Sequence, residues 1–201
     1  TALRDKVERV VLLGPAHHVG FQGLALSETE FFLTPLGDIP IDHSFDRTLL
    51  QLPFGKIREA PHVREHSLEV QLPFLQEILG HFKLIPIVVG EARPEDVGQV
   101  LSTLWNGPET LFIISSDLSH YHDYCTAQKR DKKTAQAIEN LKPEDLHHDD
   151  ACGRNPIRGL LNIAKQRGLN FTTLDLRNSG DTAGAKDQVV GYGAWSFTEP
   201  R

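Results

Sequence analysis

The chain has 201 residues, a formal net charge of −6 at pH 7 and a pI of about 5.9. This length predicts a single domain, residues 1–201, that can bury roughly 70% of its unfolded surface without disulfide bonds. The acidic balance, with no cluster of basic residues, argues against a nucleic-acid partner. No apolar run approaches the roughly 18 residues of a membrane span, so we expect no membrane partner. Only Cys125 and Cys152 are present, which favours a reducing compartment and a cytoplasmic protein.

Apolar runs of strand length alternate with helical patterns along most of the chain. Continuous apolar runs are typical of strands that are buried on both faces. Strands are expected at residues 10–13, 23–26, 30–33, 83–89 and 111–114, and more alternating strands at 170–176 and 189–197. Helices are expected within 42–52 and at 67–79, 94–104, 127–141 and 156–167, with a short one from Pro143.

This order of elements predicts the fold class. Strand, helix and strand in repeated succession are typical of a doubly wound sheet with helices on both faces. We therefore expect an α/β protein, a three-layer α/β/α sandwich with a mixed, largely parallel central sheet, to which the last two strands could add antiparallel. Ser67 is a plausible N-cap, and Pro73 predicts a kink or a late start in the helix that follows it.

Two adjacent histidines follow the first expected strand, in Gly14-Pro15-Ala16-His17-His18. Loops at the ends of buried strands carry ligand-binding and catalytic groups in α/β proteins. His17 is therefore a candidate site residue, and a loop histidine bonded to a backbone carbonyl is the alternative. His18 is adjacent and should point elsewhere, and it is a further pocket candidate.

A second polar segment, Ser115-Ser116-Asp117-Leu118-Ser119-His120, follows the strand at 111–114. If this segment turned into a helix, Asp117 and His120 would share a face and could bracket one substrate. The alternative is that Ser116 or Asp117 caps the next element, and both interpretations stay open at this point.

Cys152 precedes Gly153, Arg154 and the helix expected at 156–167. Arg154 and the positive end of the helix would favour a thiolate, whereas a buried small hydrophobe is the ordinary role of a free cysteine. Thiolate, imidazole and carboxylate together are ligands for iron, copper or zinc. The same groups could instead form a cysteine hydrolase.

His66 and Glu69 are spaced three residues apart at the start of a predicted helix, in Glu65-His66-Ser67-Leu68-Glu69. They are further pocket candidates, and a capping arrangement of the acids is the alternative. The chain has no Gly-x-Gly-x-x-Gly, P-loop or Gly-x-Ser-x-Gly motif, so nucleotide-binding and esterase functions lack their usual signatures.

Seven motifs together resemble those of the Memo family, whose bacterial members are called AmmeMemoRadiSam system protein B. Three of them are the Gly-Pro-Ala-His-His, Ser-Ser-Asp-Leu-Ser-His and Cys-Gly-Arg-Asn-Pro segments at 14–18, 115–120 and 152–156. The others are residues 65–74, 86–90, 178–184 and 190–194. The resemblance extends from about residue 9 to residue 197.

The resemblance implies a fold similar to the class III extradiol, or LigB-type, dioxygenases. It also implies a pocket with a metal, iron or copper, held by two histidines and a cysteine. His17 and Cys152 match two of these ligands by motif. His120 matches the position of an acid/base histidine, and Asp117 matches a further pocket residue.

The family's other metal histidine belongs to a Pro-His-Ala-Gly-Tyr motif, which does not occur in these 201 residues. The chain also starts without Met, so we expect a Memo-like domain that lacks its N-terminal segment and exposes a free sheet edge.

The resemblance implies a metal-dependent, dioxygenase-like redox protein that takes a small-molecule or peptide ligand. The alternative function is a non-catalytic module that binds a peptide or protein in the same pocket, since family members have been linked to phosphotyrosine-peptide binding. The sequence specifies neither the substrate nor an oligomeric state.

Overall fold

A computed structural model describes residues 3–4 and 6–200 of the chain. The chain divides into two compact units, residues 1–115 and 116–201, and each is described by itself. The prediction of a single domain stays a prediction. Within the described residues, no helix is both long and apolar enough to cross a membrane.

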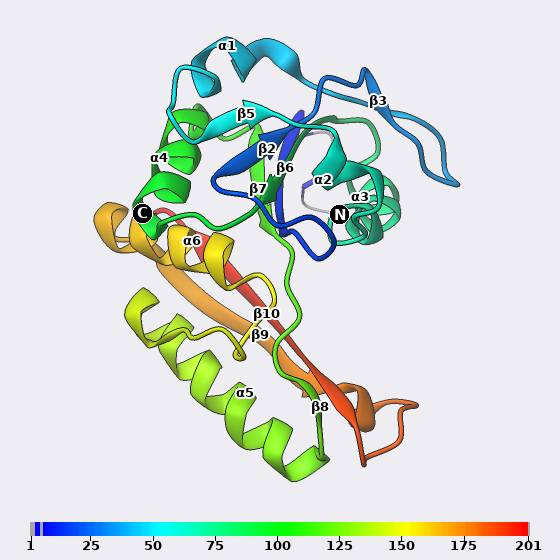
Figure 1. Cartoon of the computed structure of the whole chain (residues 1–201), viewed down its shortest axis with the longest axis vertical. Helices are drawn as coiled ribbons and strands as arrows, with labels where there is room; N and C mark the ends of the chain where they lie inside the picture. Colours follow the sequence, from blue (N-terminus) through cyan, green and yellow to red (C-terminus); the bar gives the residue numbers. More distant parts are fainter. Residues whose placement is uncertain (1–2, 5, 201) are drawn as a thin grey trace. The chain divides into compact units, whose positions relative to one another are not determined.

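The first unit is built on a five-stranded sheet with the order β5-β2-β6-β1-β7 (Figure 1). Its central strand pairs are parallel, because β1 runs parallel to both β6 and β7. Strand β2 runs parallel to β5 but antiparallel to β6, which confirms the predicted mixed, largely parallel sheet. The strands are β1 (Arg9–Pro15), β2 (Leu24–Leu26), β5 (Gly55–Ile57), β6 (Lys83–Val89) and β7 (Thr110–Ile114).

Helices cover both faces of this sheet. Side chains alternate between the faces of a strand, and Val10 and Leu12 of β1 pack in one core cluster with Leu72 of α3 (Leu72–Leu79). Helix α4 (Pro94–Leu104) lies on the opposite side of the sheet from α3 (Figure 1). The predicted three-layer α/β/α arrangement is therefore present in this unit. Its shorter elements are β3 (Phe31–Phe32), β4 (Ile39–Pro40), η1 (His43–Phe45), α1 (Asp46–Leu49), α2 (Ala60–Val63) and η2 (Glu69–Gln71).

The helix expected from Ser67 begins later than its apolar pattern. Helix α3 starts at Leu72 and has Pro73 in its first turn, where the missing N–H of proline does no harm. The late start that Pro73 predicts is confirmed. Ser67 does not cap a helix, because its hydroxyl donates to the carbonyl of Pro15 at 2.9 Å.

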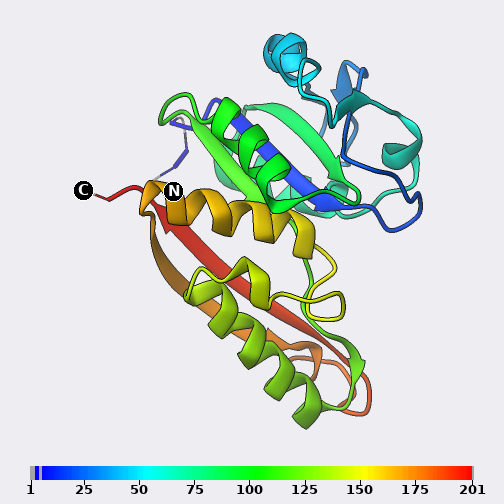
Figure 2. The same ribbon diagram turned by 60° about the vertical axis from the view of Figure 1, so that its left-hand side comes forward.

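The second unit contains a separate three-stranded antiparallel sheet with the order β8-β10-β9. Helix α5 runs along β9 and β10 (Figure 2). The antiparallel pairing of the last two strands is confirmed, but they form this sheet and do not extend the five-stranded one. The elements are β8 (His120–His122), α5 (Tyr124–Glu139), η3 (Pro143–Asp145), α6 (Arg154–Arg167), β9 (Asn170–Asn178), η4 (Ser179–Asp181) and β10 (Val189–Thr198).

Two helices of this unit begin before their predicted first residues. Helix α5 starts at Tyr124 and not at Ala127, because the Asp123 side chain accepts the N–H of Thr126 and caps the helix. Helix α6 starts at Arg154, so that Cys152 lies just before its N-cap, Gly153.

An ion pair ties β1 to the segment before α1. Arg9 Nε donates to Asp42 Oδ2 at 2.6 Å, and the Asp42 side chain is 7% exposed. Burial acts to raise the pKa of Asp42, but hydrogen bonds from Ser44 and Arg9 outweigh it and the pKa is lowered. A carboxylate whose pKa is lower in the folded state stabilises the fold above its unfolded pKa, and this contribution disappears as pH falls through the folded pKa.

We therefore expect Asp42→Asn to lower the free energy of unfolding by about 1–3 kcal/mol at pH 7. The difference from the wild type should shrink below about pH 4, where the unfolded carboxyl protonates. Urea unfolding followed by circular dichroism across this pH range measures both values. A difference that does not change with pH would contradict the assignment to the charged pair.

Candidate functional site

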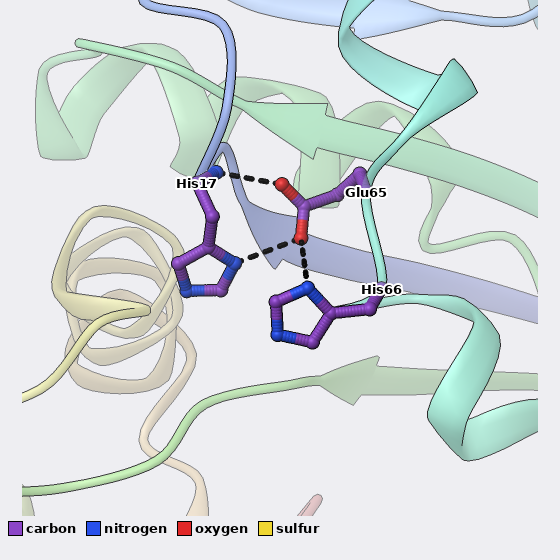
Figure 3. A group of neighbouring side chains, drawn as sticks. All are labelled: His17, Glu65 and His66. Atoms are coloured by element: carbon purple, nitrogen blue, oxygen red, sulfur yellow. Dashed lines mark hydrogen bonds and ion pairs between the residues drawn. The ribbon is translucent and has the colours of Figure 1, made fainter.

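The first candidate cluster lies just beyond the end of β1 and comprises His17, Glu65 and His66 (Figure 3). One potential ligand atom from each residue lies within 4.8 Å of the other two. Strand β1 delivers His17 two residues after its last residue, Pro15, and the other two residues lie between α2 and η2. All three residues belong to the first unit.

Glu65 organises this cluster. Its carboxylate accepts the His17 backbone N–H at 2.6 Å, the His17 ring Nδ1 at 2.8 Å and the Ser67 N–H at 2.9 Å. The Glu65 side chain is 1% exposed. Burial acts to raise its pKa, but the hydrogen bonds from His17 outweigh burial and the pKa is lowered, so the group is ionised. An ionised carboxylate only accepts hydrogen bonds, so Nδ1 of His17 carries the proton and Nε2 is left for another partner.

The other predicted residues of this region differ in their contacts. The His66 ring stacks on the His17 ring with centroids 4.8 Å apart, and its Nδ1 lies 3.6 Å from Glu65 Oε1. The His18 ring approaches His66 edge-on at 6.0 Å. Glu69 lies in η2, and among the described residues no hydrogen bond or ion pair links it to the cluster. Functional roles for His66, His18 and Glu69 stay predictions.

The second candidate cluster lies in the second unit and comprises Asp117, His120 and Cys152, with ligand atoms that also lie within 4.8 Å. Asp117 Oδ2 lies 3.6 Å from His120 Nε2, an ion-pair distance longer than a hydrogen bond. Residues 116–119 are irregular and His120 opens β8, so the helix considered for this segment does not form. The two side chains meet through the turn into β8 instead.

Two hydrogen bonds join Cys152 to the backbone of Asp117, and each residue donates one of them. Asp117 N–H donates to Cys152 Sγ, and Cys152 N–H donates to Asp117 O, both at 3.2 Å. Gly153 N–H donates to Ser116 Oγ at 2.8 Å. Burial raises the pKa of the Cys152 thiol, and the Asp117 N–H only partly opposes it. The expectation that Arg154 and the helix end favour a thiolate is therefore wrong for the free cysteine, because burial dominates.

Sequence reasoning missed Glu65 as a site residue and considered it only within the capping arrangement that was the alternative to a pocket role for His66 and Glu69. The only signal was an acid directly before a candidate histidine, which surface helices also show. Its role depends on His17, which lies 48 positions earlier in the chain.

The similarity to a known family extends over almost the whole chain. The profile of the Memo-like protein family matches residues 1–196. The chain belongs to the Memo family. A MEMO1 family protein of Aquifex aeolicus is 36% identical over 198 residues, which cover 92% of this chain and 73% of the relative. A MEMO1 family protein of Aeropyrum pernix is 35% identical over 210 residues, which cover 96% of this chain and 73% of the relative.

A eukaryotic protein shows the same similarity. The protein memo-1 homolog of Caenorhabditis elegans is 29% identical over 219 residues, which cover 92% of this chain and 63% of that protein. Four motifs of the Memo resemblance contribute residues to the two clusters, residues 14–18 and 65–74 to the first and residues 115–120 and 152–156 to the second. The assignment of His17 and Cys152 as metal ligands stays a prediction, as do the catalytic roles of His120 and Asp117.

Proposed function

We propose that this Memo-family chain binds a redox-active transition metal, iron or copper, and that His17 and Cys152 are metal ligands. The bond from His17 Nδ1 to the buried Glu65 carboxylate carries the proposal. Metal-ligating histidines commonly donate one ring N–H to a carboxylate, which fixes the tautomer and leaves the other nitrogen to bind the metal. His17 has this arrangement with Nε2 as the free nitrogen.

The donor atoms fit such a metal. The His17 side chain is 30% exposed, so its ring remains accessible while Glu65 holds it. The Cys152 sulfur is held by the Asp117 N–H, and the Ser116 hydroxyl lies 3.7 Å from it. Sulfur and imidazole donors favour iron, copper or zinc over magnesium or calcium, whose ligands are oxygens.

A bound iron or copper ion would supply one-electron redox chemistry. We assign to His120 the exchange of a proton at Nε2 with a small-molecule or peptide ligand, because imidazole is the side chain that most often acts as a general acid or base. Asp117 lies 3.6 Å from this nitrogen and would orient the ring. The proposed class is a dioxygenase-like oxidoreductase.

Metal analysis tests the assignment. We expect anaerobically reconstituted wild-type protein to retain iron or copper after desalting, and His17→Ala to retain at least about tenfold less, since a ligand contributes more than its supporting hydrogen bond. His81→Ala is the control, because it removes an exposed imidazole that belongs to neither cluster, and it should bind as the wild type does.

Two results would overturn this function. One is a wild-type protein without bound metal after reconstitution with Fe(II) and with Cu(I). The other is equal metal retention by the wild type and His17→Ala. A metal-free protein that binds a phosphotyrosine peptide would instead establish the non-catalytic binding function.

A further inference from the structure

Asp131 is a buried acid in the middle of α5, outside both candidate clusters. It is 3% exposed, and its Oδ1 accepts the backbone N–H of Ser119 at 3.0 Å. Burial raises the pKa of this carboxyl, and the Ser119 N–H opposes the rise. Burying a carboxyl group destabilises a fold unless hydrogen bonds or ion pairs compensate for the lost contact with water. The Ser119 N–H supplies such a hydrogen bond to Asp131.

Strand β10 approaches the same carboxylate. Gly191 N–H donates to Ser119 O, and Leu118 N–H donates to Gly191 O, both at 2.8 Å. A Cβ atom added to Gly191 would collide with the Asp131 carboxylate. The backbone of Gly191 does not have a positive φ, so its conformation does not demand glycine. The absence of a side chain at 191 is what lets Asp131 reach Ser119.

We propose that Asp131 is a positioning residue for the cluster of Asp117, His120 and Cys152. Asp131, Ser119 and Gly191 form a clamp that fixes residues 118–119 between α5 and β10. Asp131 itself is not part of the metal-ligand group and acts through the backbone. This inference rests on the proposed metal-binding function.

The clamp acts on the two residues that separate Asp117 from His120. Asp117 is bonded through its own backbone to Cys152, and His120 begins β8 directly after Ser119. A shift of residues 118–119 therefore moves Asp117, whose N–H donates to the proposed ligand atom Cys152 Sγ, as well as His120. Supporting contacts of this kind typically change metal affinity by about 10- to 100-fold when they are removed.

A Co(II) titration followed by thiolate-to-cobalt charge-transfer absorption tests the clamp, because this band reports cysteine ligation. We expect Asp131→Ala to bind Co(II) about 10- to 100-fold more weakly than the wild type. Asp131→Asn keeps an acceptor oxygen for the Ser119 N–H and should restore most of the affinity. Lys133→Ala is the control, because it changes an exposed side chain of the same helix two residues after Asp131, and it should bind as the wild type does.

Gly191→Ala provides a second, independent variant. In the wild-type background it should displace the Asp131 carboxylate and weaken Co(II) binding to a similar extent. In the Asp131→Ala background, Gly191→Ala should weaken Co(II) binding little further. Such non-additive losses indicate that the two residues act through one shared clamp. Additive losses, or wild-type affinity in Asp131→Ala, would overturn the proposal.

The failure of the clamp and the failure of metal binding can be told apart. If the wild type shows no cobalt–thiolate band, the proposed thiolate–metal function fails. The clamp is then judged in metal-free protein by hydrogen exchange of the Ser119 amide. We expect faster exchange in Asp131→Ala and in Gly191→Ala than in the wild type and in Lys133→Ala, and equal rates would contradict the clamp.

Discussion

Glu65→Gln is expected to weaken metal binding about 10- to 100-fold and to lower the free energy of unfolding by about 1–3 kcal/mol. Both carboxylate oxygens of Glu65 are in use, because Oε2 accepts the His17 N–H and Oε1 accepts His17 Nδ1 and the Ser67 N–H. An amide has one acceptor oxygen and one NH2 group. In either orientation of the amide, at least one of these backbone N–H groups faces a donor, so this near-isosteric change is disruptive.

Three measurements check this result. Co(II) titration gives the affinity, urea unfolding gives the stability, and nitrogen NMR of the His17 ring reports which nitrogen carries the proton. Glu77→Gln is the matched control, because it makes the same change at an exposed position outside both clusters and should leave all three values unchanged. If Glu65→Gln behaves like Glu77→Gln, Glu65 does not organise the site.

Cys152→Ser is expected to reduce the affinity for Cu(I) by more than about 100-fold. This is the largest loss that removal of a hydrogen bond supporting a ligand typically causes, and loss of the ligand itself should exceed it. Thiolate is a soft ligand that selects Cu(I), whereas a serine hydroxyl is a poor ligand for it. The hydroxyl can still accept the Asp117 N–H that Sγ accepts at 3.2 Å, so we expect the fold to be retained.

Competition for Cu(I) with a chromophoric chelator measures this loss. Cys125→Ser is the control, because Cys125 is the other cysteine of the chain and is exposed. It should compete as well as the wild type. Wild-type affinity in Cys152→Ser would remove this cysteine from the ligand set.

The elements that sequence reasoning predicted best are those with clear local boundaries. The strand at 83–89 was predicted with its observed bounds, because a continuous apolar run ends at Gly90. The start of α4 was also correct, since Pro94 suits a first helical turn. The start of α5 was not, because Asp123 is one polar residue among many and only its bond to Thr126 identifies it as the cap.

Part of the candidate site was predictable because some of its residues directly follow strands with clear boundaries. His17, Asp117 and His120 follow strands, and their positions are visible in the order of the chain. The local conformation of Asp117 and His120 was not predictable, because Leu118 and Ser119 bond to Gly191 on a distant strand and are drawn away from a helix. Glu65 and Asp131 were missed as site residues because tertiary structure brings their partners, His17 and Ser119, to them from other parts of the chain.

The contacts of Glu65 also affect how a metal would be acquired. The carboxylate bonds to the backbone as well as to the ring of His17, so folding alone orders this imidazole. The conformational entropy of the side chain is then lost during folding and does not reduce the affinity of the binding step. Metal uptake would accordingly be fast and nearly silent in far-ultraviolet circular dichroism, as in a site that is rigid before its ion arrives.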